Sequence, residues 1–127
     1  MKKVILFIIA LTLVGTSGFA ADNYTGQYKK KNGEVNVQMI SDSQIKFWIN
    51  TVVGMHPCNI GEDGNAAATF VDKNRAAFSG EGKCAVVFRF EKNKLTVTSK
   101  ECDGYCGSQA AGSINGVYIK KSSKPSF

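Results

Sequence analysis

The four cysteines and the single histidine are the side chains best suited to covalent or metal chemistry. The cysteines are Cys58, Cys84, Cys102 and Cys106, and the histidine is His56. The spacing of the last two cysteines is not a standard zinc pattern. An even cysteine count is typical of disulfides in an exported chain, and the N-terminus described below indicates export. We therefore expect two disulfides and no bound metal.

The sequence lacks the side-chain patterns that catalysis requires. His56 would need a nucleophile and an orienting acid beside it, and no serine stands in a nucleophile-elbow motif. Three residues separate Cys102 from Cys106, whereas a thioredoxin-type redox site has two between its cysteines. The acidic pairs Glu62–Asp63 and Glu101–Asp103 lie in loops, and glycoside hydrolysis needs two carboxyl groups held across a cleft. We expect a non-enzymatic protein without a cofactor.

The segment around the last two cysteines has the features of a recognition loop. Residues 101–112 form a glycine-rich loop, and Asp103 and Tyr105 are expected at its exposed tip. An aromatic side chain in a disulfide-closed loop loses little freedom on binding, so Tyr105 is our first candidate for contact with a partner. His56 and Trp48, which is expected on an outward strand face, are further candidates. Alternatively, Asp103 and Tyr105 only cap the end of the domain.

Alternating apolar and polar residues predict eight short strands and no long helix. The strands are expected at residues 24–30, 34–40, 45–49, 66–71, 75–79, 84–91, 95–99 and 113–121. Residues 53–65 are expected to be the longest irregular stretch. The class of fold is therefore all-β.

Tight turns between these strands predict their arrangement. Asn32-Gly33 favours a hairpin, because both residues tolerate positive φ angles, and Lys92-Asn93 fits a second two-residue turn. Tight turns make consecutive strands antiparallel neighbours. Eight strands in such a meander can close into a small barrel, which removes exposed strand edges. We expect this barrel, with an open two-sheet sandwich as the alternative.

The hairpin register gathers the cysteines at one end of the barrel. If Lys92-Asn93 is the turn, Cys84 lies opposite Glu101 and beside Cys102. Four cysteines allow three pairings. Our first expectation is Cys58–Cys84 with Cys102–Cys106. The alternative is Cys58–Cys106 with Cys84–Cys102, which the hairpin register favours.

The N-terminus has the anatomy of a secretory signal peptide. Lys2 and Lys3 precede a short apolar run, and small residues stand before a cut after Ala20. The apolar run is shorter than the ~20 residues needed to span a bilayer. We therefore expect residues 1–20 to be removed, residues 21–121 to form one domain, and residues 122–127 to be a flexible tail. The mature protein should be periplasmic or secreted, without a transmembrane segment.

The mature chain is basic. Removing residues 1–20 leaves 14 basic and 10 acidic residues, a net charge of +4. The densest cluster is Lys29-Lys30-Lys31, next to a predicted turn. We expect this cluster to be a solvated hairpin tip, with contact to an anionic partner such as a membrane surface or cell-wall polymer as the alternative. The chain has no nucleic-acid-binding motif, and we expect no nucleic acid partner.

In length, cysteine use and repeated short strands, the mature chain resembles the small periplasmic β-barrel proteins that include bacterial lysozyme inhibitors. The segments Gly26-Gln27-Tyr28 and Gly116-Val117-Tyr118 are also similar to the first and last strands of lipocalin- or avidin-like barrels. The first resemblance implies a barrel that binds a protein; the lysozymes that such proteins block are usually basic.

Three functions are compatible with these features. The first, which we favour, is a binding or inhibitor module that presents the cysteine-rich loops to a protein partner such as a cell-wall hydrolase. The second is a small-ligand carrier. Small side chains that could leave room for its ligand are Ala66, Ala67, Ala68, Ala76 and Ala77. The third, a cell-envelope hydrolase, lacks an identifiable acid–base pair or nucleophile.

Overall fold

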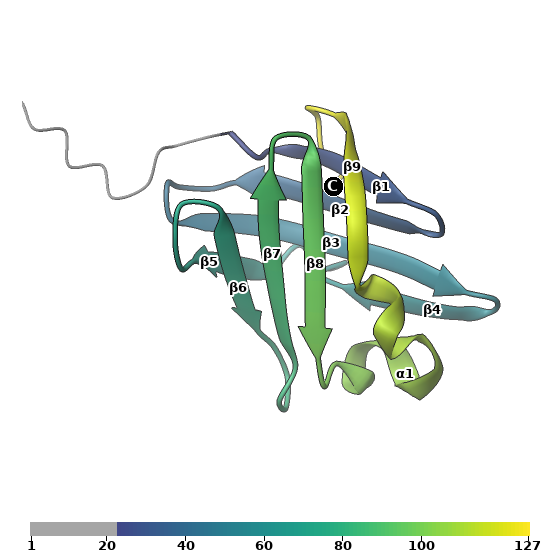
Figure 1. The fold of residues 1–127 in the computed structure, drawn as a ribbon. Coiled ribbons are helices and arrows are strands. Elements are labelled where there is room, and N and C mark those ends of the chain that lie inside the picture. The colour runs from purple at the N-terminus through teal and green to yellow at the C-terminus, as the bar shows by residue number, and fades with distance from the viewer. Residues whose placement is uncertain (1–22) are drawn as a thin grey trace, which may run out of the picture.

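The computed structural model describes residues 23–127, so the predicted signal peptide lies outside the described residues (Figure 1). It contains nine strands, one short helix and one 3₁₀ turn. The strands are β1 (Gly26–Lys30), β2 (Gly33–Met39), β3 (Gln44–Val53), β4 (His56–Ile60), β5 (Ala67–Phe70), β6 (Arg75–Ser79), β7 (Ala85–Glu91), β8 (Lys94–Lys100) and β9 (Gly116–Ser122). The helix is α1 (Asp103–Ala110), and the 3₁₀ turn that follows it is η1 (Ala111–Ile114).

Eight of the strands form a closed antiparallel barrel. The sheet runs β2-β1-β9-β8-β7-β6-β5-β3, and the pairing of β3 with β2 closes the ring. These are the eight strands expected from the sequence, joined in chain order as a meander. The predicted all-β barrel is therefore confirmed, and the sandwich alternative is wrong.

The predicted hairpin register is also confirmed. In the β7–β8 hairpin Glu91 pairs with Lys94, and Phe90 pairs with Leu95. Lys92 starts the turn with a φ of 49°, and Asn32 adopts 59° in the β1–β2 turn. Both hairpins therefore depend on residues in the left-handed region, which asparagine enters at a lower cost than most residues.

The ninth strand, β4, corrects one expectation. Residues 53–65 were expected to be irregular, but β4 pairs with the second half of β3, from Ile49↔Ile60 to Val53↔His56. β5 pairs with the first half of the same edge, so β4 and β5 run in the same direction along β3. Gly61, at φ 89°, directly follows β4 and begins the connection to β5. Its chain approaches the Phe47 carbonyl so closely that a Cβ atom would collide with it.

Large side chains fill the barrel interior. Phe47 and Phe88 lie 4.6 Å apart between ring centroids, and Tyr24 stacks on Phe90 at 4.3 Å. Ala68 is fully buried within the same apolar cluster. The small interior alanines are thus matched by aromatic rings of neighbouring strands, as dense packing requires.

The segment after β8 corrects a second expectation. Residues 101–112 were expected to be a loop, but most of them form α1 and η1. Gly107, at φ 68° and ψ 163°, breaks the helical conformation inside α1. The helix packs against β4, which lies outside the barrel ring. Within the described residues no helix has the length and apolarity to cross a bilayer.

The C-terminal tail crosses the outside of the barrel. The Ser126 N–H donates a hydrogen bond to Asn36 Oδ1 at 2.8 Å, and Lys46 Nζ lies 4.6 Å from the centroid of the Phe127 ring. These contacts place Ser126 and Phe127 over β2 and β3, whereas Ser122 is the last residue of β9 and pairs with Gln27 of β1. The flexibility predicted for residues 122–127 stays a prediction.

Candidate functional site

Two disulfides fix one end of the barrel, and their pairing corrects our first expectation. Cys58 in β4 is bonded to Cys106 in α1, and Cys84 before β7 is bonded to Cys102 after β8. The expected Cys58–Cys84 and Cys102–Cys106 pairs are wrong, and the alternative pairing is confirmed. The physical reason is twofold: the β7–β8 register brings Cys84 to Cys102, while α1 folds back over β4. The two bonds indicate an oxidising, extracellular-type environment.

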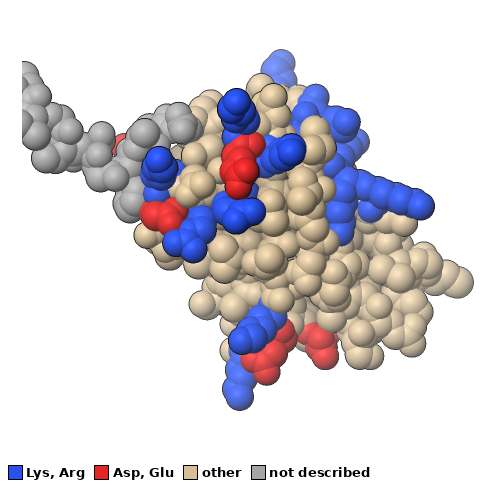
Figure 2. Space-filling view, viewed as in Figure 1, with Lys and Arg blue, Asp and Glu red and all other residues tan. Residues whose placement is uncertain are grey.

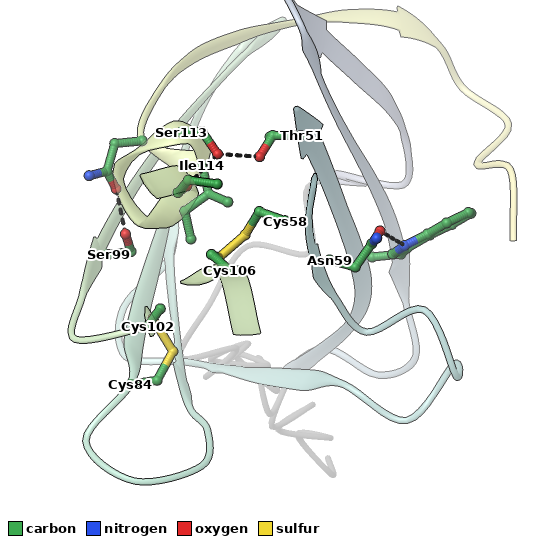
Figure 3. The surroundings of a disulfide bond; sticks show 12 residues. Thr51, Cys58, Asn59, Cys84, Ser99, Cys102, Cys106, Ser113 and Ile114 are labelled. Atoms are coloured by element: carbon green, nitrogen blue, oxygen red, sulfur yellow. Dashed lines mark hydrogen bonds between the residues drawn. A yellow bond between two sulfur atoms is a disulfide. The ribbon is translucent and has the colours of Figure 1, made fainter. Parts of the chain in front are cut away.

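Hydrogen bonds hold the helical segment against the barrel beside these disulfides (Figure 3). The Ser113 hydroxyl donates to the Ala110 carbonyl at 2.6 Å and lies 2.5 Å from Thr51 Oγ1. Lys30 Nζ donates to the carbonyls of Ser113 and Asn115, at 2.6 and 2.5 Å. Partial burial lowers the pKa of Lys30. Lys30 therefore supports η1 rather than serving as a free surface charge.

A groove of about 410 Å³ opens beside the disulfides, where β5 and β6 diverge. The two strands pair at Thr69↔Ala77 and Phe70↔Ala76, next to their turn, and they separate on the side away from that turn. The groove is lined by Ile60, Gly61, Asp63, Asn65, Ala66, Phe78, Ser79, Gly80, Glu81 and Tyr105. It has an apolar floor that includes the buried Ile60 and Ala66.

Tyr105 forms one wall of this groove. Its hydroxyl accepts a hydrogen bond from the Glu81 N–H at 3.0 Å, and its ring lies 6.4 Å from that of Phe78. Gly80 allows this approach, since a Cβ atom there would come within 2.7 Å of the Tyr105 hydroxyl. Tyr105 is therefore half-buried rather than exposed at a loop tip. Tyr105 packs against the barrel end and also lines the groove, so the capping role and the recognition role weighed from the sequence both stay predictions.

The rim of the groove is mainly acidic. Asp63 and Glu81 line it, and Glu62 and Asp103 each stand within two residues of a lining position. Two basic residues are near the rim: Lys83, within two residues of a lining position, and Lys46, whose Nζ would lie 3.5 Å from a Cβ atom at Gly64 in the same turn as Asp63. The Asp63 carboxylate also accepts a hydrogen bond from the Asn65 N–H at 3.0 Å, which holds it in the turn. The arrangement suits a basic side chain whose carbon stem lies on the apolar floor.

The structure separates the four predicted recognition residues. Asp103 is exposed at the start of α1, next to the groove. His56 is exposed at the start of β4, in the protruding β3–β4 hairpin. Trp48 lies on the outer face of β3 and donates from Nε1 to Asn59 Oδ1 at 3.3 Å (Figure 3). Only Asp103 and Tyr105 therefore belong to the groove region.

No constellation for covalent or metal chemistry is found within residues 23–127. All four cysteines are oxidised, and no group of three or more His, Cys, Asp or Glu side chains is placed to hold a metal ion. Within the described residues, no hydrogen bond or ion pair joins His56 to a serine or a carboxylate.

Sequence reasoning missed two features of this end. Phe78 lies in the predicted strand 75–79 and Glu81 in the connection that follows it, and no periodicity shows that they face the segment around Asp63. The hairpin tip at Met55, which is 93% exposed, was hidden within the stretch expected to be irregular. The Val52-Val53-Gly54-Met55 segment carried a usable signal, since a glycine between apolar residues can form an exposed turn.

A second hollow of about 590 Å³ lies at the opposite end of the barrel, between Tyr24, Lys73 and Phe90. It adjoins the first described residues, and the disulfides lie at the other end.

Comparison of the chain with protein-family models, curated proteins and solved structures finds no match.

Proposed function

We propose that the protein is an exported, non-enzymatic binding module that acts in the periplasm or outside the cell. Its partner is a protein, with a cell-wall hydrolase as the class we favour, and its recognition surface is the groove at Tyr105. The predicted signal peptide and the two disulfides both support an oxidising compartment.

The observation that carries this proposal is a rigid groove with an apolar floor and an acidic rim. Its walls belong to segments anchored by Cys58–Cys106 and Cys84–Cys102, so little conformational freedom is lost when a partner docks. Asp63 and Glu81 complement a basic surface. Lysozymes are usually basic, so the local charge of this groove suits such a partner even though the whole chain is basic.

The two other functions have less support from the described residues. A small-ligand carrier needs space inside the barrel, and aromatic side chains such as Phe47 and Phe88 occupy the interior beside the small alanines. A hydrolase needs an activated nucleophile or paired carboxyl groups around bound substrate. Asp63 and Glu81 share a groove, but neither is buried or in contact with a nucleophile.

A cell-wall clearing assay tests the proposal. The oxidised mature protein, residues 21–127, is added to a panel of lysozymes and other peptidoglycan hydrolases acting on suspended cell walls. We expect inhibition of at least one basic hydrolase. The variant Asp63→Asn with Glu81→Gln should weaken it about a hundredfold or more, because close charge pairs at interfaces contribute about 1.5 kcal/mol or more each and the variant removes two of them.

The control is Glu91→Gln, which removes one acidic charge at the other end of the barrel. Glu91 is exposed and paired with Arg89 at 3.1 Å, so its loss should leave inhibition unchanged. Asparagine at position 63 keeps the oxygen that accepts the Asn65 N–H, so the turn should be preserved. Absence of inhibition across the panel, or equal inhibition by the groove variant, contradicts the proposal.

A further inference from the structure

The β3–β4 hairpin ends in an exposed apolar tip. Residues 52–57 are six consecutive exposed positions. Met55 is 93% exposed, Val53 44% and Val52 39%. Gly54 makes the turn at φ 59° and faces open space. Three neighbouring apolar side chains are therefore exposed at the end of this hairpin. Figure 1 shows the β3–β4 hairpin protruding from the barrel.

Both strands of this hairpin are anchored directly behind the tip. On β3, Thr51 is buried and its hydroxyl bonds to that of Ser113. On β4, Cys58 is buried and bonded to Cys106 of α1 (Figure 3). The tip is thus held on a rigid base, and its apolar side chains are kept away from the barrel core.

Lysines flank the tip, and the one acidic residue among them, Glu34, pairs in register with Lys29 and with Asn50. The β1–β2 turn lies against the hairpin, since the Val52 N–H donates to the Asn32 carbonyl at 3.0 Å. Lys29 and Lys31 are exposed on this turn. Residues 29–33 and 50–58 contain no acidic residue, and the nearby Glu34 carboxylate accepts hydrogen bonds from Gln27 and Asn36. Figure 2 shows lysine or arginine side chains on this side of the molecule, above an end where no Lys, Arg, Asp or Glu is visible in this view.

The tip extends beyond the lysines by a distance that fits a bilayer interface. Gly33 of the β1–β2 turn pairs with Thr51, and Gly54 lies three residues further along the hairpin. At about 3.3 Å per residue, the tip reaches roughly 10 Å past the turn. Apolar faces of interfacial proteins enter the headgroup–acyl boundary by about 5–10 Å. Lysines set back by this distance lie at the level of the headgroups.

We propose that the β3–β4 hairpin anchors the protein peripherally to an anionic lipid bilayer. Met55, Val53 and Val52 enter the interface, and Lys29 and Lys31 contact the headgroup phosphates. A flat anionic surface fits an apolar tip with cationic groups behind it, because burial of the tip and attraction of the lysines occur together. This surface is separate from the Tyr105 groove, and the proposal does not depend on the function assigned to that groove.

Vesicle co-sedimentation of the oxidised mature protein tests this proposal. The probes are phosphatidylcholine vesicles with and without about one-third phosphatidylglycerol, at low and physiological salt. We expect binding to the anionic vesicles that weakens with salt, and little binding to the neutral ones. Lys29→Gln with Lys31→Gln should weaken binding about 20- to 30-fold, since each lysine near the surface contributes about a fivefold factor. Met55→Ser should weaken it about tenfold or more.

Matched controls remove the same groups elsewhere. Lys73→Gln with Lys92→Gln removes two exposed lysines at the other end of the barrel, and Val71→Ser removes an apolar side chain that is 58% exposed. Both controls should bind almost as the parent does. The proposal is overturned if anionic vesicles are not bound, or if Met55→Ser binds as tightly as the parent. It is also overturned if the control lysine pair loses as much affinity as Lys29 and Lys31, which would indicate adsorption by net charge alone.

Discussion

Removal of each disulfide in turn should destabilise the protein by different amounts. The perturbations are Cys58→Ala with Cys106→Ala, and Cys84→Ala with Cys102→Ala. The first bond joins residues 48 apart in sequence and the second joins residues 18 apart. All four cysteines are buried, so the packing lost with the sulfur atoms is similar in the two variants.

The magnitudes follow from the entropy of the unfolded chain. In the chain-entropy model, closing the longer loop stabilises the folded state by about 4 kcal/mol and closing the shorter one by about 3 kcal/mol at 25 °C. Domains of this size have a free energy of unfolding of about 5–15 kcal/mol. Each bond therefore contributes a large part of the free energy of unfolding. The variant that lacks Cys58–Cys106 should be less stable than the variant that lacks Cys84–Cys102, by about 1 kcal/mol.

Urea titration followed by circular dichroism measures both free energies of unfolding. The reasoning is refuted if the Cys84–Cys102 variant is the less stable one, or if neither variant differs from the parent. Peptide mapping checks the pairing itself. Trypsin with a protease that cleaves before Asp103 separates all four cysteines, and residues 84–89 should be recovered bonded to the Glu101-Cys102 dipeptide.

Three further predictions concern single residues. Tyr105→Phe removes the hydroxyl that accepts a hydrogen bond from the Glu81 N–H, so it should lower the free energy of unfolding by about 1 kcal/mol in a urea titration. An unchanged value would show that this hydrogen bond is not formed in solution. Gly61→Ala should lower the free energy of unfolding by about 1–3 kcal/mol, because φ at this position is 89° and the new Cβ atom would meet the Phe47 carbonyl. Gly82→Ala, at φ 61° in open space, should lower it less. Equal shifts of the melting temperature in the two variants would contradict this reasoning. Burial raises the pKa of Tyr28 to about 12 and raises that of Tyr118 too, above the ~10 of an unfolded chain. The folded state then retains protons that the unfolded state releases, so the free energy of unfolding should fall as the pH rises from about 10 to 12; a constant value over this range in urea titrations would contradict the burial of these phenols.

The barrel could be predicted because its strands and turns are marked by patterns of residues that are close together in the sequence. Alternation in segments such as β7, where Val86, Phe88 and Phe90 are buried, marks a strand with one face in the core. The Lys92-Asn93 turn then sets the β7–β8 register, and with it the neighbourhood of Cys84 and Cys102.

The remainder depended on tertiary contacts that the sequence pattern does not show. Pro57 and the flanking glycines made β4 look like a loop, although it pairs along the second half of β3 and lies outside the ring. Gly104 and Gly107 concealed α1, whose helical form is supported by the bond from Cys106 to β4. The Tyr105 groove arises from the divergence of β5 and β6, which no alternation of residues predicts.

Mapping of the partner contact by nuclear magnetic resonance tests the central claim most directly. The ¹⁵N-labelled mature protein is titrated with the hydrolase that it inhibits, and amide shifts are followed. We predict the largest changes at residues 60–66, 79–81 and 103–105, which surround the groove, and little change in the outer face of β7 and β8. Shifts confined to other surfaces, with the groove amides unchanged, would contradict the assignment of the groove as the recognition site.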